Sequence, residues 1–530
     1  MKKFTVSFNY IPNYILIISI VIALIMIIIF PKWTVDDAYI IFRYARNLAT
    51  HSQLTWNLNE KPVEGYTGII LPFLITAAFK INVSPILASH LIGIISYLIG
   101  GIYLFLLFKT IRIKNIISSI VILIYSTTPI LYTHVFSGLE TILFTSSITI
   151  AIYYTILFLK KGITASYLYQ SWYFFWLLFL SLIRPEGILL SILLILAMLF
   201  YLVNNKDRAF IKKVLPVAIV MYIIPFLIYY YWRWNYYGQF FPNTYYLKAG
   251  VKGYSFEAYH SLINMIKDNL GIPFIIALFL FSLSIDKVWK DIINGQNEII
   301  SKEFLIVYLA SFIFILILTY QYINANLLMN FSHRFFVPFF PILLVSLAIL
   351  LNIGLENFQN LSKINPFTYK FYFFVIIIFV IVHFVNIISS FKKEIISTDR
   401  NMNLTEAMEI SVGKFIGNNF NQNKTLLVYT DAGAIPFYSN IRTVDFGGIN
   451  DKFLSHIANL SKRQIVDYFF SVNADILSIT SYNINRLQLN ESFDWDVLKL
   501  IKSDTRFKKY KLIKVFGTPS WGYYQFVFTK

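Results

Sequence analysis

The chain has 530 residues, of which 57% are hydrophobic and only 14% are charged, and its mean hydropathy is +0.63. This composition is too apolar for a soluble protein of such length and predicts a polytopic membrane protein. The formal net charge of +18 is expected to lie in cytoplasmic loops and at the lipid surface rather than to bind nucleic acid, and the absence of cysteine excludes disulfides, thiolate metal sites and a thiol nucleophile.

Long apolar runs end near Phe391, which divides the chain into two predicted domains. Residues 1–391 are expected to form an α-helical transmembrane domain, in which residues 31–84 make an external loop with interfacial helices. Residues 392–530 have the mixed composition of a soluble domain, and we expect them to fold as an extracytoplasmic α/β domain.

The first apolar run, residues 14–30, follows Lys2 and Lys3 and lacks an A-x-A cleavage signal. It is therefore predicted to be a retained anchor with a cytoplasmic N-terminus. The next run, residues 69–79, has only about a dozen residues, whereas a crossing helix needs about 20. We expect it to lie on the outer face of the membrane as an interfacial helix.

The remaining apolar runs predict ten further spans, about eleven in all. They are residues 85–108, 116–132, 139–159, 172–183, 188–203, 214–232, 272–285, 304–322, 335–353 and 371–389. If residues 69–79 do not cross, every dense Lys/Arg loop of moderate length falls on one side, which the positive-inside rule assigns to the cytoplasm. The C-terminal domain then lies outside, on the extracytoplasmic face.

The turns on that outer side carry a distinctive set of ionisable residues. They are Asp36 and Asp37, the segment 134–140 (HVFSGLE), the sequence Arg184-Pro185-Glu186-Gly187, the segment 233–248 and the sequence Ser332-His333-Arg334. Ionisable residues at outer turns, with few deep inside the spans, indicate a site on the external face rather than a path through the bilayer.

The C-terminal domain shows a strand, turn and helix pattern typical of a small α/β fold. The predicted elements are strands at 425–430, 443–446 and near Ile476, a helix that includes 465–470, and a closing hairpin of 511–516 and 523–529 around Gly517-Thr518-Pro519. The sequence DAGAIP at 431–436 lacks the GxGxxG spacing of a nucleotide site, so Gly433 is expected to be a turn residue.

Asp36 and Asp37 are the main candidates for catalysis. One carboxylate can act as a general base on an attacking hydroxyl, while the second binds the acceptor or a metal ion. The alternative is a helix cap, since Ala-Tyr-Ile-Ile-Phe follows them directly. One can cap while its neighbour reacts, and we favour Asp36 as the base because Asp37 lies nearer the helix start.

Two arginines at outer turns are candidate phosphate ligands. Arg184 lies between two apolar spans, where an unpaired guanidinium is costly, so it needs a phosphate or the nearby Glu186 as a partner. Arg334 follows His333 at the start of a span, and its alternative role is a snorkelling anchor.

Lys248, in the sequence PNTYYLK, can hold a phosphate while Tyr245 and Tyr246 shape a groove. An interfacial belt of aromatic and Lys side chains explains the same residues equally well. Glu140 is expected to cap a helix or to orient an arginine, and His134 to be a hydrogen-bonded loop residue.

Metal and nucleotide signatures are poor. The sequence has no HExxH motif, no cysteine cluster and no Walker loop. The carboxylate pair at 36–37 can hold a divalent cation such as Mg²⁺ or Ca²⁺, and no other cofactor is expected.

Seven motifs occur in an order that resembles bacterial glycosyltransferases of the GT-C superfamily, in particular the terminal arabinofuranosyltransferase-like branch. They are DDAYIIFRYARNL, LTWNLNEKPVEGYTG, SGLET, RPEGILL, PNTYYLKAG, HRFFVPFFP and DAGAIPFYSNIRTVDFGGIND, spread over residues 33–451. Gly68 departs from the family's pattern, in which the sequence GYTN is expected at this place.

The resemblance implies a polyprenyl-phosphate-sugar donor, an extracytoplasmic glycan or glycolipid acceptor in the cell envelope, and inverting transfer. It assigns the base to Asp36 or Asp37, and the donor phosphate to Arg184, Lys248 and Arg334. A lipid-linked donor also explains why no nucleotide motif is present.

We therefore expect a glycosyltransferase of polysaccharide biosynthesis in the bacterial cell membrane. Two alternatives are a flippase for lipid-linked sugars, which predicts polar or broken segments at mid-membrane, and a noncatalytic cell-envelope assembly protein. The second would leave the outer acids and bases without a shared purpose.

Overall fold

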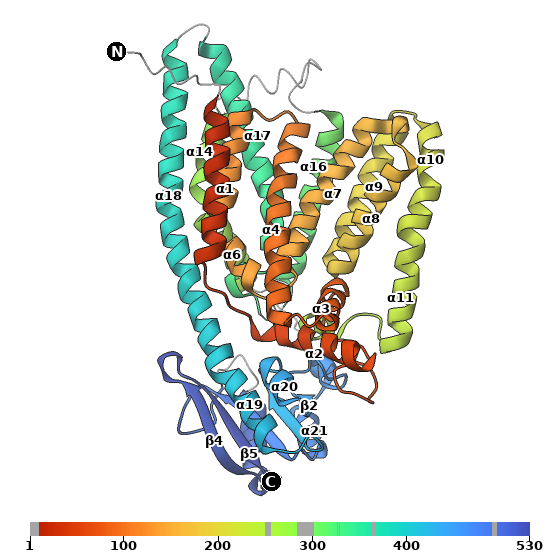
Figure 1. Cartoon of the computed structure of the whole chain (residues 1–530), viewed down its shortest axis with the longest axis vertical. Coiled ribbons are helices and arrows are strands. Elements are labelled where there is room, and N and C mark those ends of the chain that lie inside the picture. Colours follow the sequence, from red (N-terminus) through yellow and green to blue (C-terminus); the bar gives the residue numbers. More distant parts are fainter. Residues whose placement is uncertain are drawn as a thin grey trace.

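The computed structural model describes residues 10–249, 256–282, 301–325, 327, 329–362, 366–489 and 495–530. A bundle of long helices stands on a smaller domain that contains the C-terminus (Figure 1). We call the end of the bundle that faces this domain the domain end, and the other the basic end.

The described part of the bundle consists mainly of apolar helices. They are α1 (Ile11–Ile29), α4 (Pro85–Thr110), α5 (Asn115–Thr127), α6 (Pro129–Phe136), α7 (Thr141–Lys161), α8 (Tyr167–Ile183), α9 (Pro185–Asn204), α10 (Arg208–Ala218), α11 (Ile224–Tyr237), α13 (Phe256–Asn269), α14 (Gly271–Ser282), α16 (Lys302–Ile323), α17 (Phe340–Ser362) and α18 (Pro366–Met402). Short helical turns join them, namely η2 (Gly162–Thr164), η3 (Ile219–Ile223), η4 (Phe331–His333) and η5 (Val337–Phe339).

Within the described residues, seven helices are long and apolar enough to cross a membrane, or nine if each bent pair counts as one span. The bent pairs are α5 with α6, at 52°, and α13 with α14, at 79°. About eleven spans were predicted from the sequence. The two that are not among these nine fall on α8, which has only 17 residues, and on α18. The chain is thus a multi-pass membrane protein, as its composition predicts.

The helix α18 joins the bundle to the C-terminal domain without a linker. It has 37 residues and runs the length of the bundle into the lower domain (Figure 1). The predicted boundary between residues 391 and 392 therefore falls inside a continuous helix.

Two short helices, α2 (Asp36–His51) and α3 (Ile70–Lys80), lie between the bundle and the C-terminal domain (Figure 1). With 11 residues, α3 is about 16 Å long, roughly half the thickness of the hydrocarbon core. It does not cross, as predicted for residues 69–79.

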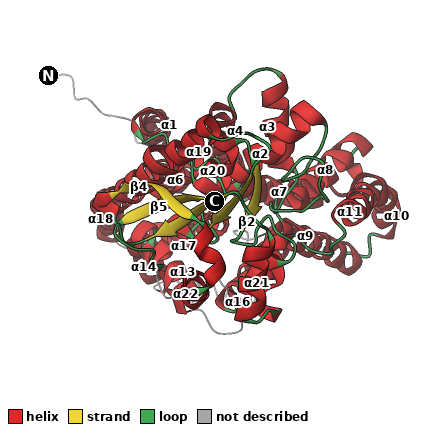
Figure 2. Ribbon diagram, turned by 90° about the horizontal axis from the view of Figure 1, so that it is seen from below, coloured by secondary structure: helices red, strands yellow, loops and turns green. Residues whose placement is uncertain are grey.

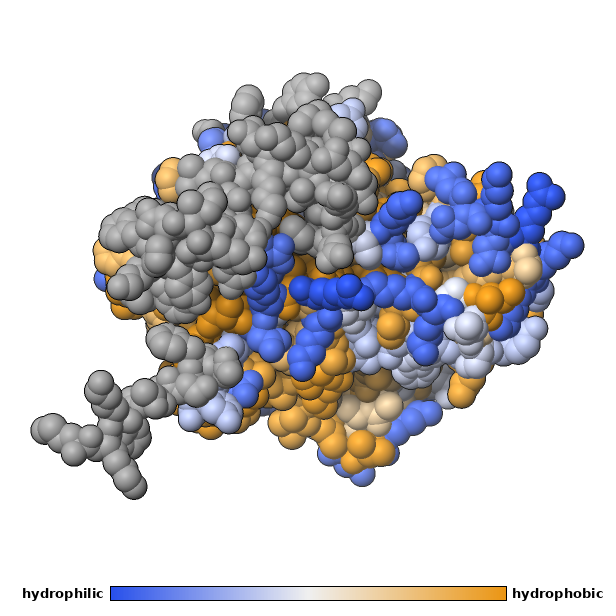
Figure 3. Space-filling model, turned by 90° about the horizontal axis from the view of Figure 1, so that it is seen from above, coloured by the Kyte–Doolittle hydropathy of each residue, from blue (hydrophilic) through white to orange (hydrophobic). Residues whose placement is uncertain are grey.

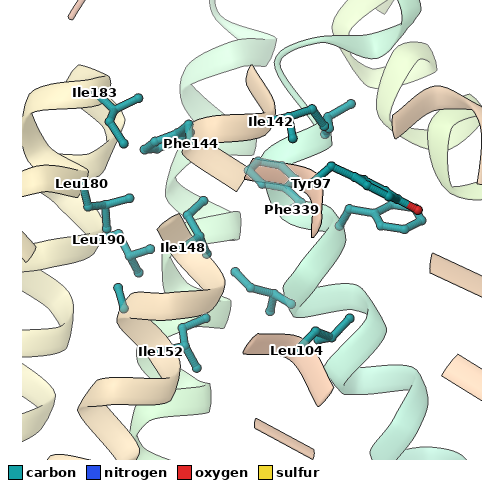
Figure 4. Packing of buried hydrophobic residues seen from close by; sticks show 14 of the residues in the cluster. Tyr97, Leu104, Ile142, Phe144, Ile148, Ile152, Leu180, Ile183, Leu190 and Phe339 are labelled. Carbon is teal, nitrogen blue, oxygen red and sulfur yellow. The ribbon is translucent and has the colours of Figure 1, made fainter. Parts of the chain in front are cut away.

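The centre of the bundle is packed with large aliphatic and aromatic side chains. Figure 4 shows Phe144, Ile148 and Ile152 of α7 facing Leu180 of α8 and Leu190 of α9. Elsewhere the backbones approach so closely that only glycine fits. A Cβ on Gly93 of α4 would be 2.1 Å from the Val135 carbonyl oxygen, so α4 and α6 pack backbone to backbone.

The C-terminal domain is a three-layer α/β/α unit. Its sheet has the order β2-β1-β3-β5-β4, in which β1 runs parallel to β2 and β3, and β5 runs antiparallel to β3 and β4. The strands are β1 (Thr425–Tyr429), β2 (Arg442–Asp445), β3 (Ile476–Ser481), β4 (Lys511–Thr518) and β5 (Tyr523–Thr529). All five predicted strands, including the closing hairpin, are confirmed.

Separate apolar layers cover the two faces of the sheet. The face toward the bundle packs on α19 (Ile410–Asn419) and α20 (Ala434–Ser439), and the other face on α21 (Lys462–Ser471) and α22 (Trp495–Ser503). The remaining short turns are η6 (Asn403–Glu409), η7 (Leu454–Asn459), η8 (Thr505–Lys509) and η9 (Pro519–Trp521). Figure 2 shows the sheet from below, under the helices of the bundle.

The basic end gathers the Lys/Arg loops. Lys160, at the end of α7, donates a hydrogen bond to the Thr110 carbonyl at the end of α4, and Lys213 of α10 donates to the carbonyl of Ala165. Figure 3 shows hydrophilic side chains across this end. Those Lys/Arg loops that the structure describes thus lie at the end opposite to the C-terminal domain.

Candidate active site

A cavity at the domain end lies beside the first turn of α2. Asp37 lines it together with Arg334, and Arg334 Nη1 is 3.7 Å from Asp37 Oδ2. The volume of the cavity is about 70 Å³. The other lining residues are Ile40, Ile41, Gly65, Tyr66, Thr67, Leu139, Glu140, Thr244, Leu247, Met329 and Ile449. Three predicted site residues, Asp37, Glu140 and Arg334, thus meet at one cavity.

A tight turn before α7 places Glu140 next to α2. The Val35 N–H donates to the Ser137 carbonyl oxygen at 3.0 Å, which ties the two segments together. Gly138 has φ +81°, and a Cβ there would be 2.9 Å from Ala38 Cβ. Glycine permits both the turn and the close approach. The SGLE sequence therefore brings Glu140 next to Asp37.

Glu140 is buried and bridges two arginines. Its Oε1 accepts hydrogen bonds from Arg184 Nη1 and Arg334 Nη2, both at 3.2 Å. Glu140 thus contacts two arginines, and although it occupies the N-cap position of α7, its side chain makes no capping hydrogen bond. Two guanidinium groups therefore converge on one carboxylate, and Arg334 is the one of the two that lines the cavity.

Arg184 does not line the cavity but contacts Glu140, which does. It also pairs with Glu186, with Nη2 2.8 Å from Oε1, and Glu186 accepts a further hydrogen bond from Tyr322 at 3.0 Å. Only 3% of the Arg184 side chain is exposed, and it does not line the cavity. The internal Arg184–Glu186 pair is therefore the interpretation that the structure bears out.

Arg334 keeps one donor without a partner. Its Nε is buried and has no hydrogen-bond partner among the described residues. An unsatisfied buried donor costs about 1–3 kcal/mol.

The opposite wall of the cavity is held by a buried ion pair that the sequence did not single out. Glu64, in the sequence PVEGYTG, accepts a hydrogen bond from Arg233 Nε of α11 at 3.0 Å. The Glu64 carbonyl oxygen also accepts from the backbone N–H of Asn243, the first residue of α12 (Asn243–Ala249), at 3.1 Å. Asn243 Nδ2 then donates to the carbonyl of Ile449, so the C-terminal domain supplies part of the wall.

Asp36 has a different role from its neighbour. Its Oδ2 accepts from the Gly433 N–H at 2.9 Å and its Oδ1 from the Ala434 N–H at 2.6 Å. Only 8% of Asp36 is exposed, and it does not line the cavity. Asp36 therefore binds the C-terminal domain at the start of α20.

Asp37 is not the N-cap residue of α2, contrary to the expectation. The N-cap is Val35, and both aspartates lie in the first helical turn, where they complement the helix dipole. Gly433 is more than a turn residue, because a Cβ on it would be 1.9 Å from the Asp36 carbonyl oxygen.

Glu409 and Asp431 surround Asp36. The three carboxylates offer oxygens that all lie within 4.8 Å of one another. Burial, reinforced by Asp431, raises the pKa of Asp36 to about 7. Burial and Asp36 together raise the pKa of Glu409 above its ordinary value.

Arg43 fastens α2 to the same domain. This buried arginine donates from Nε to the Trp56 carbonyl at 2.9 Å and from Nη2 to Asn57 Oδ1 at 3.0 Å and to the Ile441 carbonyl at 2.9 Å. The helix that carries Asp37 is thus bonded to the C-terminal domain along much of its length.

The other predicted residues whose side chains the structure describes lie outside the cavity. Tyr245 is half exposed and packs against the ring of Phe241, while His333 bonds to Ser261 at 2.7 Å beside a separate groove lined by α13. Lys248 belongs to α12, but its side chain lies outside the described residues. His134 is hydrogen-bonded, as expected, to the Ser332 carbonyl at 2.9 Å, but it lies in α6 and not in a loop.

The departure at Gly68 has a steric reason. A Cβ at this position would be 1.8 Å from the Ile183 carbonyl oxygen at the end of α8. An asparagine would not fit against this backbone, so the GYTG sequence matches the packing of this chain.

Comparisons with known proteins place this geometry in context. Residues 398–528 match a family model described as "Domain of unknown function (DUF8728)". No curated protein matches the chain. Two of the similar solved structures are ArnT from Cupriavidus metallidurans, in the apo state (10% identity, TM-score 0.58) and bound to undecaprenyl phosphate (11% identity, TM-score 0.57), each covering 97% of both chains.

A third is the Archaeoglobus fulgidus oligosaccharyltransferase tethered with an acceptor peptide. It is 12% identical with a TM-score of 0.57, over 97% of this chain and 73% of that chain. At such low identity the likeness is one of fold. The predicted fold class, a polytopic helical membrane protein of GT-C type with a C-terminal α/β domain, is confirmed.

Proposed function

We propose that the protein is a membrane glycosyltransferase that moves a sugar from a polyprenyl-phosphate donor to a hydroxyl acceptor. The observation that carries this proposal is the cavity in which Asp37 faces Arg334 at 3.7 Å. A carboxylate and a guanidinium at this separation are the two groups that such a transfer needs. One takes a proton from the acceptor, and the other receives the departing phosphate.

The reaction divides between these two groups. Asp37 accepts the proton of the acceptor hydroxyl as its oxygen attacks the anomeric carbon, and the bond from that carbon to the phosphate oxygen breaks through an oxocarbenium-like transition state. Arg334 binds the polyprenyl phosphate as negative charge develops on it. Attack from the side opposite to the phosphate inverts the anomeric configuration.

Phosphate binding also prepares the base. In the absence of donor, Arg334 is close to Asp37, and an ion pair lowers the basicity of a carboxylate. A phosphate that takes over the guanidinium weakens this pairing. The donor thus makes Asp37 a stronger base at the time when the acceptor needs one.

Glu140, Arg184 and Glu186 act through Arg334 rather than on the donor. Glu140 holds Arg334 at 3.2 Å, and Arg184 with Glu186 holds Glu140 from behind. They are positioning residues in this proposal. The phosphate role assigned to Arg184 by the motif resemblance passes to Arg334, and Lys248 stays a candidate for the same phosphate.

The likeness in fold supports a lipid-linked donor. One similar structure is ArnT bound to undecaprenyl phosphate, and another is an archaeal oligosaccharyltransferase in complex with dolichol phosphate. The order of the seven sequence motifs also resembles the terminal arabinofuranosyltransferase-like branch, which suggests a pentosyl donor. We therefore include pentosyl as well as hexosyl donors, with a cell-envelope glycan or glycolipid as the acceptor.

The charge distribution supports an extracytoplasmic site in the bacterial cell membrane. The Lys/Arg loops lie at the basic end, which the positive-inside rule assigns to the cytoplasm. The cavity and the C-terminal domain then face outward. Cysteines introduced at Ser520 and Thr164 into this cysteine-free chain test the orientation, since an impermeant maleimide should label only Ser520→Cys in intact cells.

Transfer by the purified protein tests the proposal. Radiolabelled pentosyl- and hexosyl-phosphopolyprenols are incubated with membranes from cells lacking the protein as acceptor. Wild-type protein should transfer one label, and Asp37→Asn should reduce transfer by at least about 100-fold, the lower bound for a general base. Glu406→Gln, at an exposed carboxylate outside the cavity, is the control. Movement of donor across vesicles without transfer would favour the flippase alternative.

A further inference from the structure

We propose that Asp36, Glu409 and Asp431 form a calcium site that joins the C-terminal domain to the catalytic helix α2. The proposal goes beyond the transfer reaction, because this site lies outside the cavity and does not include Asp37. It rests on the placement of the three carboxylates, on one oxygen that lacks a partner, and on the distances among the ligand atoms.

The three residues come from separate parts of the chain. Asp36 opens α2, Glu409 ends the π-helical turn η6 after α18, and Asp431 follows β1. Their oxygens converge within 4.8 Å. Among the described residues, no lysine or arginine forms an ion pair with any of the three, so no basic side chain balances the cluster when its carboxyl groups are ionised.

Two of the carboxylates are held as hydrogen-bond acceptors. Asp36 accepts from two backbone N–H groups, and Asp431 accepts from Tyr523 at 2.7 Å, Thr480 at 2.9 Å and Gln525 at 2.6 Å. Donors on both carboxylates favour their ionised forms, whereas burial acts in the opposite direction and raises the pKa of each. A cation bound among them would offset the cost of burying their charge.

Glu409 supplies the independent observation. It is only 3% exposed, and its Oε2 has no hydrogen-bond partner among the described residues. A buried carboxylate oxygen without a donor is costly, whereas a cation bound between Glu409 and its two acidic neighbours would satisfy it.

The ligand type and spacing suit calcium. The three oxygens lie within 4.8 Å of one another, so a cation equidistant from them would be at most about 2.8 Å from each, which admits Ca–O distances of about 2.3–2.6 Å. Ca²⁺ accepts irregular shells of carboxylate oxygens, whereas Mg²⁺ requires near-octahedral geometry at about 2.1 Å and keeps several of its waters. An all-oxygen set also excludes the soft ligands that zinc prefers. The geometry therefore favours Ca²⁺ over Mg²⁺, and water can complete the shell.

Calcium titration of the full-length protein in detergent, after removal of divalent ions with EGTA, tests this site. Isothermal calorimetry should show saturable binding of one Ca²⁺ per chain, with weaker binding of Mg²⁺, and CaCl₂ should raise the melting temperature. Glu409→Gln and Asp431→Asn should each weaken Ca²⁺ binding by at least tenfold. Glu406→Gln, an exposed carboxylate on the same turn, should bind Ca²⁺ like the wild type.

Two outcomes would overturn the proposal. The first is absence of Ca²⁺ binding to the wild type at millimolar concentration. The second is unchanged Ca²⁺ binding in folded Glu409→Gln. Asp37→Asn separates the two proposals, because it should lose transfer and keep calcium binding.

Discussion

Replacing Gly433 with alanine should separate the C-terminal domain from the catalytic helix. The added Cβ would be 1.9 Å from the Asp36 carbonyl oxygen and 2.6 Å from Asp36 Cγ. An ordinary contact needs about 3.4 Å or more, so α2 and the start of α20 must move apart by about 1.5 Å. That shift breaks both N–H bonds to the Asp36 carboxylate.

The magnitude follows from these two bonds. Hydrogen bonds to a charged group contribute about 1.5–3 kcal/mol each, so docking should weaken by about 3–6 kcal/mol. This corresponds to a factor of about 10² to 10⁴ in the docking equilibrium. Since Asp37 is the next residue along α2, transfer activity should fall as well.

Hydrogen exchange measured by mass spectrometry reads out docking directly. The amides of α20 and of the first turn of α2 should exchange faster in Gly433→Ala, while those of α7 stay protected. Gly271→Ala is the matched control, because its nearest neighbour would be 3.7 Å from the new Cβ. Wild-type exchange and full activity in Gly433→Ala would refute the docking role of Asp36.

Three further changes test other parts of the site. Arg334→Gln should lower kcat/KM for the lipid-phosphate donor by about 10²–10³, as for loss of a transition-state hydrogen bond, and an unchanged value in a steady-state assay would contradict the phosphate role. Glu64→Gln should lower the free energy of unfolding by about 3–5 kcal/mol in thermal unfolding, because it leaves Arg233 buried without its anion. The double variant Glu64→Gln with Arg233→Met should recover part of this loss. Burial raises the pKa of Asp445 from 3.8 to about 6, so the folded protein binds this proton more tightly than the unfolded chain does. The free energy of unfolding should therefore fall by about 2 kcal/mol as pH rises from about 4 to about 6.5, and the pH dependence should shrink in Asp445→Asn.

The membrane spans and the strands could be predicted from the sequence because their signals are local. The run at 69–79 is too short to cross, whatever surrounds it, and α3 has 11 residues. The strands of the small domain were found from short apolar runs bounded by turn residues, and the hairpin of β4 and β5 closes where expected.

The roles of the two aspartates could not be read in the same way. In the sequence, Asp36 and Asp37 are two adjacent carboxylates with the same chemistry. Asp36 was favoured as the base only because Asp37 was expected to cap the helix. What separates them is Gly433, nearly 400 residues away, whose N–H binds Asp36. Only the tertiary fold shows that Asp36 faces the C-terminal domain while Asp37 faces the cavity.

The arginines illustrate the same limit. The alternatives for Arg184 were a phosphate and Glu186, and the fold adds Glu140, which lies 44 positions earlier in the chain. Glu64 and Arg233 were missed because neither stands out in its own segment. A buried pair between distant segments leaves no spacing signal, although an acidic residue in a glycine-rich outer loop is a clue.

Release of free polyprenyl phosphate, measured by mass spectrometry during sugar transfer, tests the central claim most directly. Wild-type protein should release one molecule of the lipid phosphate for each sugar transferred, and Asp37→Asn should release almost none while it still binds the donor. Transfer by Asp37→Asn at the wild-type rate would contradict the assignment of Asp37 as the base of a lipid-linked glycosyl transfer.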